Sequence, residues 1–159
     1  MRRWKTSSEE ETRRLGVALG GELAPDGVLL LSGQLGVGKT VLAQGVATAL
    51  GVPANQVQSP SFILVREHEG TAGRFVHIDL YRLEAGETDS LGLEEILAGE
   101  GVKVIEWAER LPQPPASALR LLMREGGLRD DREIVEIGLD EQVNHVEGSA
   151  RPWARSREE

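Results

Sequence analysis

The sequence predicts a single α/β domain with a mixed, mainly parallel central sheet flanked by helices. The 159 residues are 40% hydrophobic, which suits one globular core and leaves too little chain for two ordinary domains. Early in the chain, continuous apolar runs alternate with helical patterns, as in parallel sheets covered on both faces. Later, two strand-like segments follow each other directly, so part of the sheet should be antiparallel.

The first third of the chain contains a helix, a strand and a second helix. Residues 8–11 form a capping-box pattern, and apolar residues then recur at helical spacing as far as Leu23. The run 28–31 is continuously apolar, as expected for a strand buried on both faces. A glycine-rich segment follows it, and residues 40–50 should form the next helix.

The rest of the chain is richer in strands and ends in a polar segment. Beyond residue 140 the apolar periodicity fades, so we expect a folded domain at 1–140 and a flexible polar tail at 141–159. The elements expected before the tail are an extended segment at 57–69, strands at 75–79, 102–106, 119–124 and 133–139, and a short acidic helix at 90–98.

Composition excludes several classes of function. A net charge of -8 repels phosphate backbones and argues against autonomous binding to DNA or RNA. It fits either a solvated acidic surface or an acidic face that docks on a basic partner. No apolar run approaches the ~20 residues that cross a bilayer, and the N-terminus lacks the apolar stretch of a secretory signal. We therefore expect a cytoplasmic protein that does not contact membranes.

Residues 33–40 match the phosphate-binding consensus G-x-x-x-x-G-K-[ST] at every fixed position. In such a loop the main-chain amides surround the β-phosphate, the lysine contacts the β- and γ-phosphates, and the hydroxyl binds magnesium. The preceding buried strand and following helix are the right context, which predicts a P-loop NTPase site for ATP and Mg²⁺. Its predicted nucleotide-binding residues are Gly33, Gln34, Leu35, Gly36, Val37, Gly38, Lys39 and Thr40.

Two carboxylates stand where a P-loop enzyme needs an acid. Asp79 and Glu106 each follow an apolar run directly, and strand ends of this kind face the nucleotide crevice. Either could hold magnesium, and the residues alone leave that choice open. With Lys39 they form the predicted catalytic set.

Other polar and aromatic residues near these motifs are open to two interpretations. The segment 59–62, Ser-Pro-Ser-Phe, is either a switch segment that senses the γ-phosphate or an ordinary turn. Trp107 is either a packing residue, the more common case, or a stacking platform. His77 lies within a strand and has no metal-ligand spacing around it, so it is interpreted as a residue without a functional role.

The motifs together resemble the TsaE (YjeE) family of bacterial ATPases. They occur in one order, with His-Ile-Asp-Leu-Tyr-Arg-Leu at 77–83 and Ile-Glu-Trp at 105–107 after the phosphate loop and segment 59–62. The likeness covers about residues 8–139. It implies an ATPase for the threonylcarbamoyladenosine modification of tRNA, acting with a complex of TsaD and TsaB. TsaD would transfer the threonylcarbamoyl group, so tRNA would be contacted only indirectly.

The resemblance also implies roles for single residues. Ser61 would supply the switch hydroxyl in a position where many relatives carry threonine. Arg82 would either stabilise transition-state charge or bind the partner, and the resemblance leaves that choice open. Arg129 and Arg132 lie in a region that could flank the base or the phosphates, where no motif fixes the alignment. Lys39 would hold the phosphates, Thr40 and Glu106 would hold magnesium, and Asp79, close to the metal, would position the attacking water.

Two other classes of P-loop protein remain as alternatives. A small-molecule kinase would need an arginine-bearing lid, and no arginine-rich insertion is visible. A GTPase-like switch would need an Asn-Lys-x-Asp motif or a close variant to read guanine, and the sequence has none. Transfer of phosphate to a metabolite would identify the kinase, and competition between ATP and GTP would identify the switch.

Overall fold

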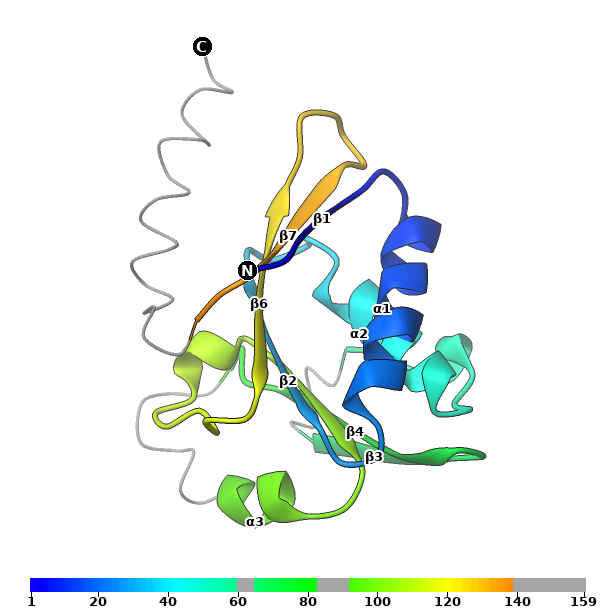
Figure 1. Cartoon of the computed structure of the whole chain (residues 1–159), viewed down its shortest axis with the longest axis vertical. Coiled ribbons are helices and arrows are strands. Elements are labelled where there is room, and N and C mark those ends of the chain that lie inside the picture. Colours follow the sequence, from blue (N-terminus) through cyan, green and yellow to red (C-terminus); the bar gives the residue numbers. More distant parts are fainter. Residues whose placement is uncertain (60–64, 83–91, 139–159) are drawn as a thin grey trace.

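A computed structural model describes residues 1–59, 65–82 and 92–138 (Figure 1). The described residues form one α/β unit around a seven-stranded sheet with the order β1-β7-β6-β2-β5-β4-β3. The elements are β1 (Arg3–Thr6), α1 (Glu9–Leu23), β2 (Val28–Gly33), α2 (Lys39–Ala49), η1 (Ala54–Gln56), β3 (Val65–Gly70), β4 (Gly73–Asp79), α3 (Leu93–Ala98), β5 (Val102–Glu106), η3 (Ala108–Arg110), β6 (Leu119–Glu125) and β7 (Arg132–Glu136).

The sheet is mixed, as the sequence predicts. The pairings β2–β5, β2–β6 and β4–β5 are parallel, whereas β1–β7, β6–β7 and β3–β4 are antiparallel. Parallel pairing therefore joins the four central strands and does not dominate the described sheet as a whole. The carboxyl ends of β2, β4 and β5 lie at one edge, where ligands of open α/β sheets bind.

Helices cover both faces of this sheet. Leu29 and Leu31 of β2 pack in the cluster that contains Leu42 of α2, while Leu30 packs in the cluster that contains Leu93 of α3. Successive strand residues point to opposite faces, so a strand covered on both sides is apolar throughout. This explains the continuous apolar run at 28–31.

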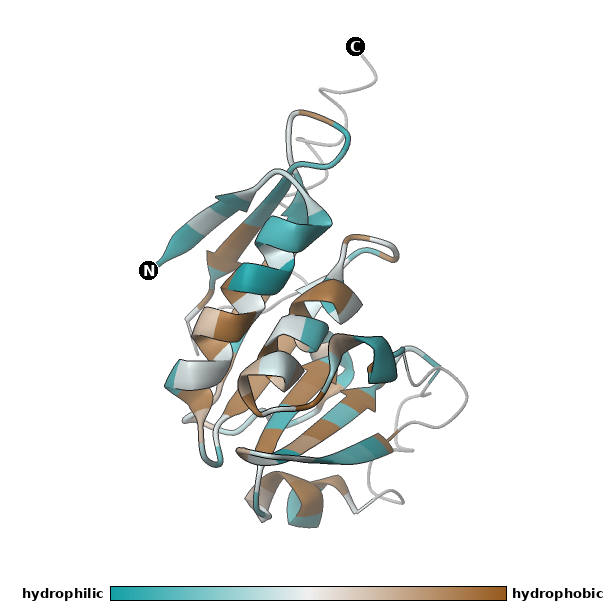
Figure 2. Ribbon diagram, turned by 90° about the vertical axis from the view of Figure 1, so that its right-hand side faces the viewer, coloured by the Kyte–Doolittle hydropathy of each residue, from teal (hydrophilic) through white to brown (hydrophobic). Residues whose placement is uncertain are grey.

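Helices α1 and α2 lie side by side over one face of the sheet (Figure 2). Their backbones meet at glycines: a Cβ atom added to Gly16 would lie 2.3 Å from the carbonyl oxygen of Leu42. One added to Gly45 would lie 2.0 Å from the carbonyl oxygen of Arg13. Both distances are far below van der Waals contact, so the spacing of the two helices depends on glycine at these positions.

Gly16→Ala should therefore destabilise the protein, although alanine is the better helix former. Overpacking destabilises a protein by about 1–3 kcal/mol, which exceeds the ~0.5–1 kcal/mol by which alanine is more stable than glycine in a helix interior. Gly21→Ala in the same helix is the matched control, because its added Cβ would meet nothing within 4 Å. Denaturant titration should show a loss for Gly16→Ala and a small gain for Gly21→Ala. Equal gains would show that the helices separate without penalty.

Several elements differ from the sequence-based expectations. Strand β1 was not predicted, because it is polar and pairs only at the edge of the sheet with β7. Strand β7 ends at Glu136 and not at residue 139, which lies outside the described residues. Within the expected extended segment 57–69, β3 begins at Val65, and residues 60–64 are not described. Helix α3 begins at Leu93 and not at residue 90, and residues 90 and 91 are not described.

The predicted tail at 141–159 also lies outside the described residues. Across the parts of the chain that the structure describes, no helix is long and apolar enough to cross a membrane.

Candidate functional site

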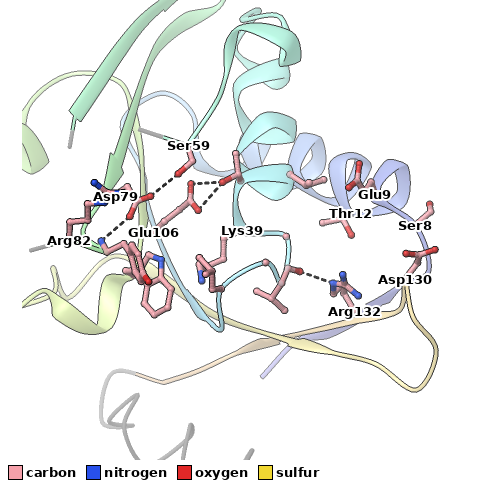
Figure 3. A pocket seen from close by; sticks show the side chains of 18 residues that line it. Ser8, Glu9, Thr12, Lys39, Ser59, Asp79, Arg82, Glu106, Asp130 and Arg132 are labelled. Atoms are coloured by element: carbon pink, nitrogen blue, oxygen red, sulfur yellow. Dashed lines mark hydrogen bonds between the residues drawn. The ribbon is translucent and has the colours of Figure 1, made fainter. Parts of the chain in front are cut away.

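A cavity of about 480 Å³ opens at the carboxyl edge of the central strands (Figure 3). Residues of loop 33–40 form its floor, and Asp79, Arg82 and Glu106 line one end. Ser8, Glu9 and Thr12 of the first helical turn, together with Asp130 and Arg132, line the other end. The cavity therefore brings together the loop and both strand-end carboxylates that the sequence singled out.

The loop has the backbone conformation of an anion-binding turn. Gly36 and Gly38 have φ angles of 79° and 106°, in the left-handed region that glycine enters without a steric penalty. Gly38 is also the N-cap of α2, which begins at Lys39. The free amides and positive dipole end of this helix consequently face the cavity, and both favour a phosphate there.

Arg132 braces this loop from strand β7. Its Nε atom donates to the carbonyl of Val37 at 2.7 Å, and Nη1 donates to the carbonyls of Arg129 and Asp131 at 2.9 Å each. The sequence left the roles of Arg129 and Arg132 open. The structure places the Arg132 guanidinium against the loop backbone, whereas Arg129 contributes a carbonyl oxygen to the same hydrogen-bonded group.

Arg132→Ala should weaken ATP binding by loosening this loop. The lost hydrogen bonds of a charged donor are worth about 1.5–3 kcal/mol, which corresponds to roughly a 10- to 100-fold rise in the dissociation constant. Arg129→Ala removes an exposed side chain and keeps the carbonyl, so it should bind ATP like the wild type. Calorimetric titration measures both, and an unchanged affinity in Arg132→Ala would show that the loop holds its shape unaided.

Lys39 lies almost fully buried at the centre of the site, with 5% of its surface exposed. Its Nζ atom donates to the carbonyls of Gly33 and Gln34, the two loop residues that do not line the cavity. The same atom lies 4.0 Å from the centroid of the Trp107 ring, within cation–π range. The lysine is thus held between loop carbonyls and an aromatic face.

Trp107 is more than the packing residue that the sequence suggested. It does pack against the cluster on the α3 face, but its ring also covers Lys39 and lies 4.8 Å from the ring of Tyr81. Its φ of 58° puts a bulky residue in the left-handed region, which costs about 1–3 kcal/mol. Among the described residues it is the one non-glycine residue with positive φ.

Glu106 and Asp79 are neighbours with different partners. They are register partners on β5 and β4, and they are 3% and 4% exposed. The Thr40 hydroxyl lies 3.0 and 3.1 Å from the two carboxylate oxygens of Glu106. Asp79 accepts hydrogen bonds from the Ser59 hydroxyl and the Tyr81 amide, both at 2.9 Å. Glu106 is thus tied to the loop helix, and Asp79 to the segment that begins at Ser59.

His77 does not line the cavity but contacts Glu106, which does, and sequence reasoning missed this contact. Its Nε2 atom lies 2.5 Å from a carboxylate oxygen of Glu106, and its ring is fully buried. The available signal was the strand period: His77 precedes Asp79 by two residues, so both side chains point to the same face. The pKa of the nearby His68 is lowered, mainly by burial and to a smaller degree by the charges of His77 and Arg66.

The donor set of the site fits magnesium better than a metal cage made by the protein alone. Thr40, Glu106 and Asp79 offer oxygen atoms, the hard ligands that Mg²⁺ prefers. No group of three or more His, Cys, Asp or Glu side chains suited to a metal occurs in residues 1–59, 65–82 and 92–138. Mg²⁺ commonly binds one or two carboxylates together with substrate phosphates, which matches this arrangement.

The fold and the site define an α/β protein that carries the phosphate-loop consensus at the carboxyl edge of its sheet. The sequence profile described as "Threonylcarbamoyl adenosine biosynthesis protein TsaE" matches residues 6–134. The chain belongs to this TsaE family, as its motifs predicted.

Individual relatives agree with this assignment. The chain is 36% identical to the tRNA threonylcarbamoyladenosine biosynthesis protein TsaE of Bacillus subtilis (strain 168) over 133 residues, which cover 83% of this chain and 82% of the relative. It is 40% identical over 126 residues to the protein of the same name from Nostoc sp. (strain PCC 7120), with 76% of each covered. The crystal structure of YdiB from Bacillus subtilis matches with a TM-score of 0.69 and 30% identity, covering 98% of this chain and 95% of that one.

The structure does not describe every predicted site residue. Ser61, the expected switch hydroxyl, lies outside the described residues, whereas Ser59 just before it contacts Asp79. The same cavity is lined by the six loop residues 35–40, which include Lys39 and Thr40, and by Asp79 and Glu106.

Proposed function

We propose that this protein is a magnesium-dependent ATPase that supports the threonylcarbamoyladenosine modification of tRNA, in concert with TsaD and TsaB. The observation that carries the proposal is the contact between the Thr40 hydroxyl and the Glu106 carboxylate beside the buried cation of Lys39. Hydroxyl, acid and lysine are the three groups that P-loop enzymes need around a triphosphate. Membership of the TsaE family supports the link to tRNA modification.

The loop and Lys39 bind the phosphates in this proposal. The amides at the start of α2 donate to the β-phosphate, and Lys39 exchanges its carbonyl partners, Gly33 and Gln34, for phosphate oxygens. A triphosphate is a far better partner for an ammonium than two neutral carbonyls. Trp107, which lies against the ammonium, keeps that side of Lys39 away from water.

Thr40 and Glu106 hold the magnesium ion, and Asp79 positions the attacking water. Bound Mg²⁺ neutralises charge on the β- and γ-phosphates. Asp79 is suited to the second role because Ser59 and the Tyr81 amide fix its carboxylate without engaging Thr40. In that orientation it accepts a proton of the water and directs the lone pair of the oxygen toward the γ-phosphate.

Turnover should be slow for the isolated chain and rise when TsaD and TsaB bind. Of the two arginines that line the cavity, Arg132 already donates to the carbonyl of Val37, and Arg82 lies at the end of the cavity beside Asp79. A partner that supplies or orients a cation at the γ-phosphate could raise the rate by orders of magnitude. Phosphate release should therefore increase when the purified complex is added.

Reconstitution tests the proposed function directly. Modification of tRNA by TsaD and TsaB is measured with this chain, without it, and with the Lys39→Ala variant. Of these three reactions, only the one that contains the wild-type chain should show sustained modification, and it should also release free phosphate. Equal modification in all three reactions would refute the role, and equal phosphate release with and without partners would refute the stimulation.

A further inference from the structure

His77 is a buried polar residue whose presence the packing does not explain. It lies on β4 between Val76 and Ile78, is fully buried, and faces the same side as Phe75, which is also fully buried. Its Nδ1 atom has no hydrogen-bond partner within the described part of the chain. A buried polar atom without a partner costs about 1–3 kcal/mol, so the Nδ1 side of the ring is unfavourable for stability.

The other ring nitrogen makes a specific contact. His77 Nε2 lies 2.5 Å from Oε2 of Glu106, a distance that requires a proton between the two atoms. On its other side the Glu106 carboxylate accepts from Thr40 Oγ1 at 3.0 and 3.1 Å. Glu106 is therefore held from both sides, by a histidine of β4 and by a hydroxyl of α2.

The ring of His77 is itself fixed in place. The ring centroid of Phe75 lies 5.8 Å from that of His77 and 6.0 Å from that of His68. A glutamate side chain has three rotatable bonds, and the lone hydroxyl of Thr40 leaves rotation of its carboxylate possible. The buried imidazole removes that freedom and holds the carboxylate where the Thr40 hydroxyl lies 3.0 Å from Oε1 and 3.1 Å from Oε2.

We propose that His77 is a positioning residue, which acts through Glu106 by donating its Nε2 proton to Oε2 and so presents the carboxylate to magnesium beside Thr40. The inference rests on the proposed function, because it concerns the same metal position. It assigns to His77 a role that neither the strand pattern nor packing accounts for. Groups that orient a metal ligand in this way typically affect metal affinity or activity by about 10- to 100-fold.

Two amide substitutions at His77 distinguish the contribution of Nε2 from that of Nδ1. The amide nitrogen of glutamine lies about as far from the backbone as Nε2, whereas that of asparagine lies near the position of Nδ1. His77→Gln should therefore keep the hydrogen bond to Glu106, and His77→Asn should lose it. With the full-length chain, the Mg²⁺ concentration for half-maximal ATP hydrolysis should stay within about threefold of wild type in His77→Gln and rise about 10- to 100-fold in His77→Asn.

Calorimetry provides a readout that does not depend on turnover. The affinity for ADP in EDTA should be the same in the wild type and both variants, because Lys39 and the loop amides bind the phosphates. The gain in ADP affinity on adding Mg²⁺ should persist in His77→Gln and disappear in His77→Asn. Equal losses in the two amide variants, or a full magnesium response in His77→Asn, would overturn the proposal.

His77→Leu distinguishes positioning from structural support. Leucine suits the apolar neighbours of His77 but leaves Oε2 of Glu106 without its imidazole donor, so this variant should fold and lose its magnesium response whatever the change in its unfolding temperature. A lower unfolding temperature with an intact magnesium response would show that His77 only supports the fold. A wild-type chain that fails to bind ADP at all, with or without Mg²⁺, would instead refute the proposed function and this inference with it.

Discussion

Lys39→Ala is expected to abolish ATP hydrolysis and to weaken the binding of magnesium–ATP by at least about a hundredfold. Removing one preorganised charged donor from a buried site typically lowers activity by about 10²–10³. The loss is larger here because Asp79 and Glu106, both buried, would then face the triphosphate without the cation. Phosphate release and calorimetric titration measure the two effects.

The matched control for this variant is Lys5→Ala, which removes an exposed lysine from the edge strand β1. It should bind and hydrolyse ATP like the wild type. Thermal unfolding should show that Lys39→Ala remains folded, since its desolvated cation–π contact with Trp107 is worth about 2 kcal/mol. Wild-type affinity for ATP in Lys39→Ala would remove the basis of the proposed function.

Glu106→Gln is expected to lower magnesium-dependent hydrolysis by about 10²–10³ while leaving nucleotide affinity in EDTA unchanged or slightly improved. The substitution keeps the shape of the side chain and removes the charge that would bind Mg²⁺ beside Thr40. It also removes a negative charge close to the phosphates, which explains the direction of the affinity change. Hydrolysis across a range of Mg²⁺ concentrations, with ADP titration in EDTA, measures both quantities.

Asp79→Asn is the informative companion to this variant. Asp79 contacts Ser59 and Tyr81 and not Thr40, so its loss should lower kcat and leave the Mg²⁺ dependence close to wild type. Glu67→Gln, an exposed substitution on β3, serves as the control for a change of charge alone. If Asp79→Asn and Glu106→Gln shift the Mg²⁺ dependence equally, the two carboxylates share one role.

The sequence predicts most of the central fold because its signals there are local. The apolar run of β2, the phosphate-loop consensus and the helical spacing of α2 each lie within one short segment. β1 had no such signal, since its four residues, of which two are exposed and one is buried, show neither a long alternation nor an apolar run. Its place is fixed by distant contacts with β7 and by the buried hydrogen bond of 2.7 Å between Thr6 and Thr12.

The partners of the two carboxylates could not be read from the sequence for a related reason. Asp79 and Glu106 both follow apolar runs, so local patterns treat them alike. What separates them is the strand order: β5 lies next to β2, whose register pairs Leu31 with Glu106, and β4 lies one strand further away. Glu106 is therefore the acid that reaches the loop helix.

Contacts between residues far apart in the chain were also beyond sequence reasoning. Arg132 reaches back to Val37, and His77 reaches across to Glu106, in each case through strand pairing that no short motif encodes. The interpretation of His77 as a residue without a functional role was reasonable for a histidine within a strand. It did not foresee the carboxylate that the neighbouring strand brings to its ring. The prediction for Ser61 stays a prediction, since that residue is not described.

Trp107 combines an unfavourable backbone conformation with a side chain that contacts Lys39 in the site. Glycine would adopt this φ without a Cβ clash, and asparagine would tolerate it, yet neither offers an indole to cover Lys39. Glycine would relieve a strain of about 1–3 kcal/mol, but it would also remove the indole that packs against the cluster on the α3 face and against Lys39. Engineering for higher thermal stability should therefore keep Trp107 and target exposed helix positions such as Gly21.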